Sequence, residues 1–204
     1  MTKAISSPRG SKDRILDATL ELAVESGWDS VTIRKIAQAI GVTAPAIYRH
    51  FASKADLMAH LHLKALKDFD AFMMERASGI SAPIDQLRIM AEGFWTFAFK
   101  YPEQYELLFS LALPAPGLEE LEQKRHEVFI GSMELMARIN PELDWDTRHD
   151  FMANYLSLVH GYTHLGLGNR LYTEEGGNAD AYHSLMRAVD RLLAQIPLPD
   201  NPET

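Results

Sequence analysis

Three adjacent side chains, Tyr48, Arg49 and His50, are of types that can bind phosphates and the edges of bases. Arginine carries a fixed charge, and the phenol and the imidazole can donate hydrogen bonds to phosphate oxygens. Ile47 and Phe51 are four residues apart, so they predict the buried face of a helix that carries these groups on its outside. An exposed tyrosine between two core positions gains nothing from burial, which favours contact with a partner.

A first short helix must position this group. Residues 32–40 predict an amphipathic helix with Thr32 as its N-cap. Gly41 follows where a left-handed residue ends a helix at little cost, and we expect Val42 to face inward. The apolar stripe at i, i+3, i+4 and i+7 consists of Ile33, Ile36, Ala37 and Ile40.

A second short helix is predicted over residues 44–50. Thr43 can cap it, and Pro45 falls in its first turn, where a missing N–H matters little. Ser53 and Asp56 then form the pattern of a capping box that opens a third helix. Two short helices joined by a glycine turn are typical of a helix-turn-helix, whose second helix fits the DNA major groove.

The string T-x-R-x-IA-x-x-x-GV-x-x-x-x-IY-x-HF-x-x-K-x-x-L resembles the N-terminal domain of TetR-family regulators, over about residues 11–60. The resemblance implies a three-helix domain that binds double-stranded operator DNA. It implies contacts to the DNA backbone from Thr32, Arg34, Thr43, Tyr48, His50 and Lys54, and contacts in or near the bases from Ala44, Pro45, Ala46 and Arg49. From the residues alone, Arg34 as a solvated charge and His50 as a helix cap stay open.

Charge is distributed unevenly along the chain. Residues 1–60 hold eight Lys/Arg and six Asp/Glu, a local charge of +2, whereas the whole chain carries −8 and the remainder therefore −10. An acidic body with a basic first quarter suits a protein of which one end meets phosphate, although so small an excess can also arise by chance.

Composition excludes several classes of protein. With 204 residues and 47% apolar residues, the chain can bury a sizeable core and is not a disordered protein. The absence of cysteine excludes disulfides, thiolate metal sites and a cysteine nucleophile. The apolar runs are far shorter than the roughly 20 residues that span a bilayer, and no secretion signal is evident. We therefore expect a cytoplasmic protein with no membrane association.

The apolar periodicity is helical throughout, so we predict an all-α fold. Its domains are a flexible basic tail over 1–10, the helix-turn-helix domain over 11–60, a helical effector-binding and dimerisation domain over 61–196, and a flexible tail over 197–204. About nine helices are expected, at 11–26, 32–40, 44–50, 54–78, 83–100, 103–112, 118–139, 145–169 and 179–195.

TetR-like regulators usually place a ligand pocket and the dimer interface in the C-terminal half. LVHGYTHL weakly resembles one C-terminal subtype marked by a His-Gly pair, here His160 and Gly161. Aromatic residues and methionines at helical spacing could be plain core, or they could line a cavity for an apolar small molecule. The candidates for effector contact are Trp95, Phe99, Phe109, Phe129, Met133, Tyr155 and His160.

Two histidines offer an alternative function. His160 and His164 lie at i and i+4, a spacing that could bind zinc, with no third ligand evident. They could equally bond an effector or be core or interface residues. A helical metal-binding protein or enzyme is the alternative to a regulator, but the chain shows no nucleophile, acid–base pair or phosphate-binding glycine loop. We expect no enzyme and no cofactor.

The last two predicted helices carry much apolar surface. The helix over 145–169 has apolar residues on two faces, and the helix over 179–195 adds another apolar face. Two such helices from each subunit would make a four-helix bundle, so we expect a homodimer through them. The overall expectation is a regulator, more often a repressor in this family, that a mostly apolar effector releases from its operator.

Overall fold

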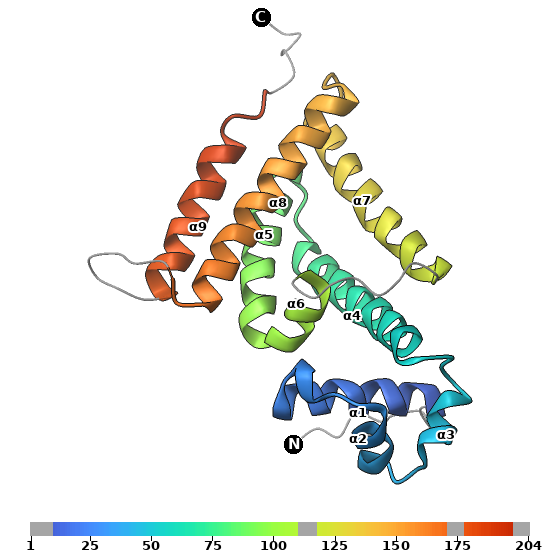
Figure 1. Ribbon diagram of the computed structural model, residues 1–204. Coiled ribbons are helices and arrows are strands. Elements are labelled where there is room, and N and C mark those ends of the chain that lie inside the picture. Colours follow the sequence, from blue (N-terminus) through green and yellow to red (C-terminus); the bar gives the residue numbers. More distant parts are fainter. Residues whose placement is uncertain (1–9, 110–117, 171–177, 198–204) are drawn as a thin grey trace, which may run out of the picture. The chain divides into compact units, whose positions relative to one another are not determined.

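The computed structural model describes residues 10–109, 118–170 and 178–197, and the regular structure in these ranges is helical (Figure 1). The predicted all-α class is confirmed. The predicted tails, apart from Gly10 and Pro197, lie outside the described residues. The elements are α1 Ser11–Ser26, the 3₁₀ turn η1 Trp28–Ser30, α2 Ile33–Ala39, α3 Ala44–Tyr48, α4 Lys54–Ala77, α5 Pro83–Lys100, α6 Pro102–Phe109, α7 Glu119–Ile139, α8 Trp145–Leu167 and α9 Asn178–Leu193.

The helix bounds agree with the predicted ones within a few residues. Helices α2 and α3 are each two residues shorter than predicted, and α3 ends at Tyr48, so that Arg49 is its C-cap. The predicted helix over 103–112 is described as far as Phe109, and its last residues lie outside the described ranges. The turn η1 was not predicted. It follows Gly27, whose φ of 75° is the left-handed conformation that glycine adopts without strain.

The chain forms two compact units. Unit 1 comprises the residues up to Leu66 together with Glu103–Gln123, and unit 2 comprises Lys67–Pro102 together with the residues from Lys124 onward. Helix α4 therefore contributes its first half to unit 1 and its second half to unit 2. In the described part of the chain, every helix is too short or too polar to cross a bilayer.

Unit 1 has an apolar core in which α1, α2 and α3 pack together. Ile15 of α1, Ile36 of α2 and Ile47 of α3 are at most 2% exposed. Phe51 closes this core after α3, and Leu57 joins it from the first turn of α4. These are the residues that the helical periodicity assigns to the inner faces, which is why three short helices can hold one another in place.

In unit 2, α5, α8 and α9 lie side by side (Figure 1). Tyr155 of α8 is buried, and its hydroxyl donates a hydrogen bond to the carbonyl oxygen of Leu87 in α5 at 2.6 Å. Leu185 and Val189 of α9 are completely buried within the chain. The apolar face of α9 is thus largely covered by its own subunit, more than the sequence alone suggested.

Candidate nucleic-acid interface and ligand region

The turn between α2 and α3 is fixed by backbone hydrogen bonds around Gly41. This glycine has a φ of 70°, its amide bonds to the carbonyl of Gln38, and the amide of Val42 bonds to the carbonyl of Ala37. These two bonds are a Schellman motif, which satisfies the last carbonyls of α2 and needs a left-handed residue at its C′ position. The predicted role of Gly41 is confirmed.

Two details of this turn differ from expectation. Val42 is 39% exposed, so the prediction that it faces inward was wrong: this C″ residue does not make the buried hydrophobic contact that often accompanies the motif. Thr43 is the N-cap residue of α3, but its side chain makes no capping hydrogen bond. Its hydroxyl is exposed and available to another partner.

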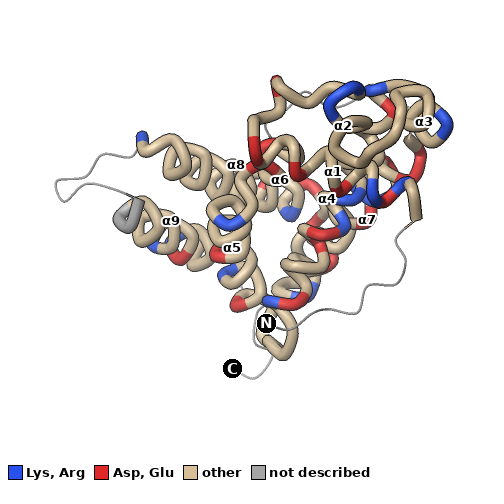
Figure 2. The backbone as a smooth tube through the Cα atoms, turned by 90° about the horizontal axis from the view of Figure 1, so that it is seen from below, with Lys and Arg blue, Asp and Glu red and all other residues tan. Residues whose placement is uncertain are grey.

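Helix α3 separates a buried face from an exposed one. Ile47 is fully buried and Phe51 is 1% exposed, whereas Tyr48 is 51% exposed. Arg49 and His50 are exposed at the end of the helix. Figure 2 shows basic positions on α2 and beside α3. The outer side of α3 therefore presents a phenol, a guanidinium and an imidazole.

The beginning of α3 presents small side chains. Pro45 is exposed, and Ala44 and Ala46 are half-buried. Small residues at the start of a helix let its backbone approach a flat surface such as the edges of base pairs. This arrangement suits the N-terminal end of a recognition helix.

The first turn of α2 and the start of α4 are tied together by Lys54. Its Nζ donates a hydrogen bond to the carbonyl oxygen of Val31 at 2.7 Å, next to the N-cap of α2. Thr32 caps α2 as predicted, since its hydroxyl accepts a hydrogen bond from the amide of Lys35. Arg34 is exposed. An ammonium has three protons, so Lys54 can hold this position and still contact a phosphate.

The predicted capping box at the start of α4 is confirmed in one of its two bonds, and the return bond goes to the amide before Ser53 instead of to that of Ser53 itself. The amide of Asp56 donates to the hydroxyl of Ser53 at 3.0 Å, and the carboxylate of Asp56 accepts from the amide of Ala52 at 2.7 Å. Such reciprocal bonds fix how the chain enters a helix. They hold the end of α3 in a defined orientation relative to α4.

Comparison with known protein families shows to which family the chain belongs. The family model described as bacterial regulatory proteins, tetR family, matches residues 15–61, which contain α2 and α3. The model described as Tetracyclin repressor-like, C-terminal domain, matches residues 87–192, more than half of the chain. The chain belongs to the TetR family. The resemblance seen in residues 11–60 is thereby confirmed and extends to the C-terminal half.

Relatives of this TetR-family chain are distant. It is 27% identical over 112 residues to an uncharacterized HTH-type transcriptional regulator of Mycobacterium tuberculosis, covering 54% of the chain and 51% of that protein. It is 27% identical over 141 residues to the HTH-type transcriptional repressor KstR of the same species, covering 69% of the chain and 64% of the repressor. The chain thus spans less than two thirds of the length of either protein.

A solved structure supports the same fold. The structure of a Rhodococcus protein of unknown function matches with a TM-score of 0.75 at 14% identity, covering 95% of this chain and 99% of that one. At this level of identity the likeness concerns the arrangement of helices. The two proteins therefore share this arrangement along nearly the whole chain.

Two of the predicted ligand-contact residues meet on the surface of unit 2. The rings of Trp95 and Phe99, one turn apart on α5, are stacked with centroids 4.5 Å apart. Trp95 is half-buried and also meets Tyr182 of α9, while Phe99 is 37% exposed. A β-carbon at Gly166 of α8 would stand 2.5 Å from the indole, so the ring lies against the α8 backbone. Trp95 fills this position because residue 166 has no side chain.

The other predicted ligand-contact residues occupy different surroundings. Phe129 is 37% exposed and meets Trp145 and His149 edge-on. Met133 and Tyr155 are at most 2% exposed, as core residues are. Phe109 belongs to unit 1, where its ring meets that of Tyr105. The seven residues therefore do not all share one aromatic cluster.

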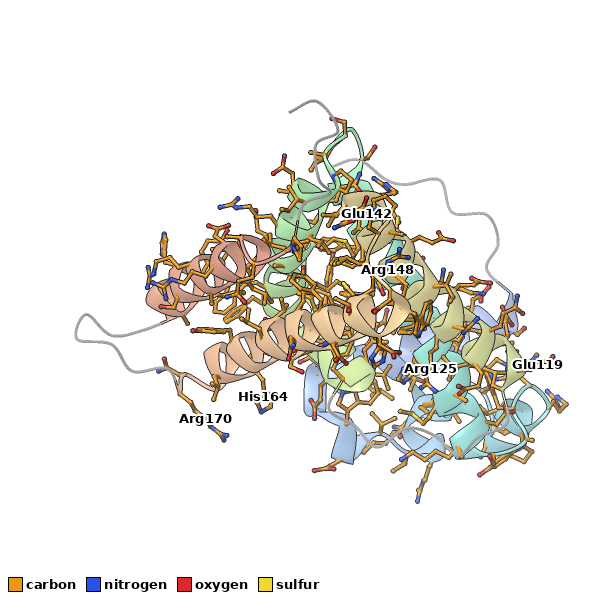
Figure 3. All side chains as sticks on the ribbon, turned by 90° about the horizontal axis from the view of Figure 1, so that it is seen from above. Glu119, Arg125, Glu142, Arg148, His164 and Arg170 are labelled. Atoms are coloured by element: carbon orange, nitrogen blue, oxygen red, sulfur yellow. The ribbon has the colours of Figure 1, made fainter. Side chains whose placement is uncertain are left out.

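The two histidines of α8 have different environments. His160 is half-buried with its ring edge-on to Phe94 at 5.0 Å, and burial lowers the pKa of His160 to about 4. His164 is exposed and projects from the outside of α8 (Figure 3). Within the described ranges, no group of three or more His, Cys, Asp or Glu side chains is arranged to hold a metal ion. His160 at neutral pH is an uncharged hydrogen-bonding group in an aromatic setting.

Thr163 is a polar group that the sequence analysis missed. It is fully buried on α8, and its hydroxyl makes no hydrogen bond to a described part of the chain. At 100° per residue, its direction on the helix lies between those of His160 and Gly166. Those two residues meet Phe94 and Trp95, so Thr163 faces the sector that these two rings cover. Only tertiary structure reveals an unpaired hydroxyl, since a threonine on an apolar helix face is unremarkable by spacing.

Proposed function

We propose that this protein is a transcriptional regulator that binds duplex operator DNA through α2 and α3 as a homodimer and most often represses. The observation that carries the proposal is the division of α3, which buries Ile47 completely while Tyr48 is 51% exposed. Arg49 supplies a fixed positive charge on the same outer side. Phosphate contacts from such groups set affinity and register, and side chains of α3 contact base edges. The proposal places the protein in the cytoplasm, where bacterial DNA lies.

The proposed dimer uses the outer faces of α8 and α9. Leu165 of α8 is 38% exposed, and Leu156, Leu158 and Tyr162 are half-buried on the same helix. Leu192 of α9 is half-buried as well. Apolar groups left at the surface after a subunit has folded favour association with a second copy. Two recognition helices would then read two half-sites about one helical turn or more apart.

The proposed effector is a mostly apolar molecule that unit 2 binds beside Trp95, Phe99 and His160. The partial exposure of the two stacked rings supports a ligand that can reach them, and the neutral imidazole can orient it. The ligand acts only through different affinities for the two conformers of the dimer. A roughly 100-fold loss of DNA affinity requires about 2.7 kcal/mol of coupling, which additional burial of about 100 Å² of apolar surface would supply.

A DNA-binding experiment tests the proposed function. Fluorescence anisotropy with the DNA upstream of the protein's own gene should show binding that weakens steeply with salt, because phosphate contacts release counterions. Arg49→Ala should weaken binding at least tenfold. Arg138→Ala, the same change on the exposed face of α7, should bind as the unmodified protein does. Absence of binding to this DNA and to the neighbouring intergenic segments would overturn the proposal.

A second experiment tests the effector. A thermal-shift screen of metabolites and drugs should yield a ligand that raises Tm and releases the DNA. Trp95→Ala should weaken this response and leave DNA binding without ligand near normal. A ligand that competes with DNA at α3 itself would contradict a site in unit 2.

A further inference from the structure

Unit 1 has a solvent-open hollow of about 110 Å³ that joins elements far apart in the sequence. Ser11 and Arg14 from the first turns of α1 line it together with Arg49 and His50 from the end of α3. The turn after α2 closes another side. Two of the polar groups, those of Ser11 and Arg14, thus lie outside the helix-turn-helix, 30 or more residues before α3 begins at Ala44.

The floor of the hollow is apolar. Ile15 of α1 is 2% exposed, and Ile40 and Ala46 are half-buried. Val42, which is 39% exposed, lies among them. An apolar floor can pack against the C–H groups of a deoxyribose, because apolar surface gains free energy on leaving water.

The rim of the hollow is basic. It carries the guanidinium groups of Arg14 and Arg49, the imidazole of His50 and the hydroxyl of Ser11, all on exposed residues. No Asp or Glu is among the described residues that line the hollow. The acidic residues of α1 therefore do not neutralise the positive charge of the rim from inside the hollow. Two fixed positive charges and a hydroxyl donor match the oxygens of a phosphate diester.

We propose that the hollow receives one sugar–phosphate unit of duplex DNA, with Arg14 and Ser11 of α1 contacting its phosphate from one side and Arg49 from the other. The contact extends the DNA interface beyond α2 and α3. It rests on the proposed DNA binding, because Arg49, the C-cap of α3, lines the hollow and also belongs to the proposed DNA-binding surface. It also explains why an apolar side chain can stay exposed at position 42 next to two arginines.

The salt dependence of binding to a duplex of random sequence tests this inference, since a phosphate contact does not depend on base sequence. One lost contact lowers the slope of log K against log salt by about 0.9, which corresponds to roughly eightfold weaker binding at 0.1 M salt. Arg14→Ala should show both effects. Arg14→Lys keeps the charge and should keep the slope, and Arg138→Ala in unit 2 should change neither.

Each outcome separates the inference from the function on which it rests. If Arg49→Ala weakens binding and Arg14→Ala leaves both slope and affinity unchanged, the hollow does not receive a phosphate, although DNA binding stands. If Arg14→Ala weakens binding without a change in slope, with an unchanged circular dichroism spectrum, the contact is not ionic and the inference is overturned as well. If the unmodified protein binds no duplex at all, the proposed function fails and this inference fails with it.

Discussion

The indole of Trp95 lies against the backbone of Gly166. A β-carbon at position 166 would stand 2.5 Å from Cη2 and 2.8 Å from Cζ3 of the ring. Real β-carbons do not come this close to another heavy atom, so any other residue at 166 must move the indole or the helix. The ring is also stacked on Phe99 and meets Tyr182 of α9, so a movement of the indole would disturb these contacts. The pair connects α5 to α8 at the region proposed to bind the effector.

Gly166→Ala should therefore destabilise the protein despite the better helix propensity of alanine. Overpacking of this kind costs roughly 1–3 kcal/mol, which exceeds the 0.5–1 kcal/mol that Gly→Ala gains in a helix. The Tm should fall by several degrees and the tryptophan fluorescence should change. Gly131→Ala on α7 is the matched control, since nothing lies within 4 Å of a β-carbon there, and its Tm should stay or rise. A rise in Tm for both variants would show that the indole moves aside freely.

Thr163→Val should raise the stability of the ligand-free protein. A buried hydroxyl without a hydrogen bond costs about 1–3 kcal/mol, and valine has the same shape without that group. An increase of about 1 kcal/mol corresponds to roughly 2–4 °C in Tm for a chain of this size. The same variant should respond more weakly to the effector if the hydroxyl binds it.

Thr19 provides the control for this change. It is also fully buried, but its hydroxyl donates to the carbonyl oxygen of Ile15 at 2.7 Å. Thr19→Val removes a hydrogen bond and should lower stability by about 1 kcal/mol. Opposite signs for the two substitutions are the expected result, measured by thermal or urea unfolding. A loss of stability in Thr163→Val would mean that its hydroxyl has a partner after all.

The stability of the protein should fall with acid in a way that depends on His160. Burial lowers the pKa of His160 to about 4 in the folded protein, below the roughly 6.5 of an unfolded histidine. The unfolded state therefore binds more protons between these values. The contribution of the neutral imidazole to the free energy of unfolding is therefore fully present above about pH 6.5 and is lost as the pH falls toward 4. At pH 5 about 2 kcal/mol of this free energy is lost.

His160→Gln should reduce the difference in unfolding free energy between pH 7 and pH 5. His164→Gln is the matched control, because His164 is exposed on the same helix. Urea unfolding at the two pH values measures the difference. An equal pH dependence in the His160 variant and the unmodified protein would contradict a buried neutral imidazole.

Local chemistry made much of the N-terminal region predictable. Thr32 as a cap, Gly41 in a left-handed turn and the Ser53–Asp56 capping box each depend on residues within four positions of one another. The helical period is equally local, which is why the helix bounds fall within a few residues of expectation. The resemblance to TetR-family regulators follows from the same short stretch, and the family model that matches residues 87–192 extends it to the C-terminal half.

What could not be predicted depends on contacts between distant segments. Arg14 joins the hollow beside Arg49 only because α1 packs against the helix-turn-helix. The lack of a hydrogen-bond partner for the buried hydroxyl of Thr163 can be seen only once α8 is packed in the folded chain. Aromatic spacing cannot tell the stacked Trp95 from the core residue Tyr155, since both lie on helices with apolar stripes. Helical periodicity predicts which face of a helix is apolar, but only tertiary packing determines which residues cover that face.

The proposed dimer can be tested by two substitutions that the sequence alone would treat alike. Val189 on α9 is fully buried within its own subunit, whereas Leu165 on α8 is 38% exposed. Val189→Glu buries an unpaired charge and should unfold unit 2. Leu165→Glu should keep the helical circular dichroism spectrum and yield monomers in sedimentation velocity. Its operator binding should weaken strongly, because a monomer reads one half-site.

Two outcomes would contradict this prediction. If Leu165→Glu is folded and remains dimeric, the interface does not lie on this face of α8. If the unmodified protein is monomeric at micromolar concentration, the proposed dimer is refuted.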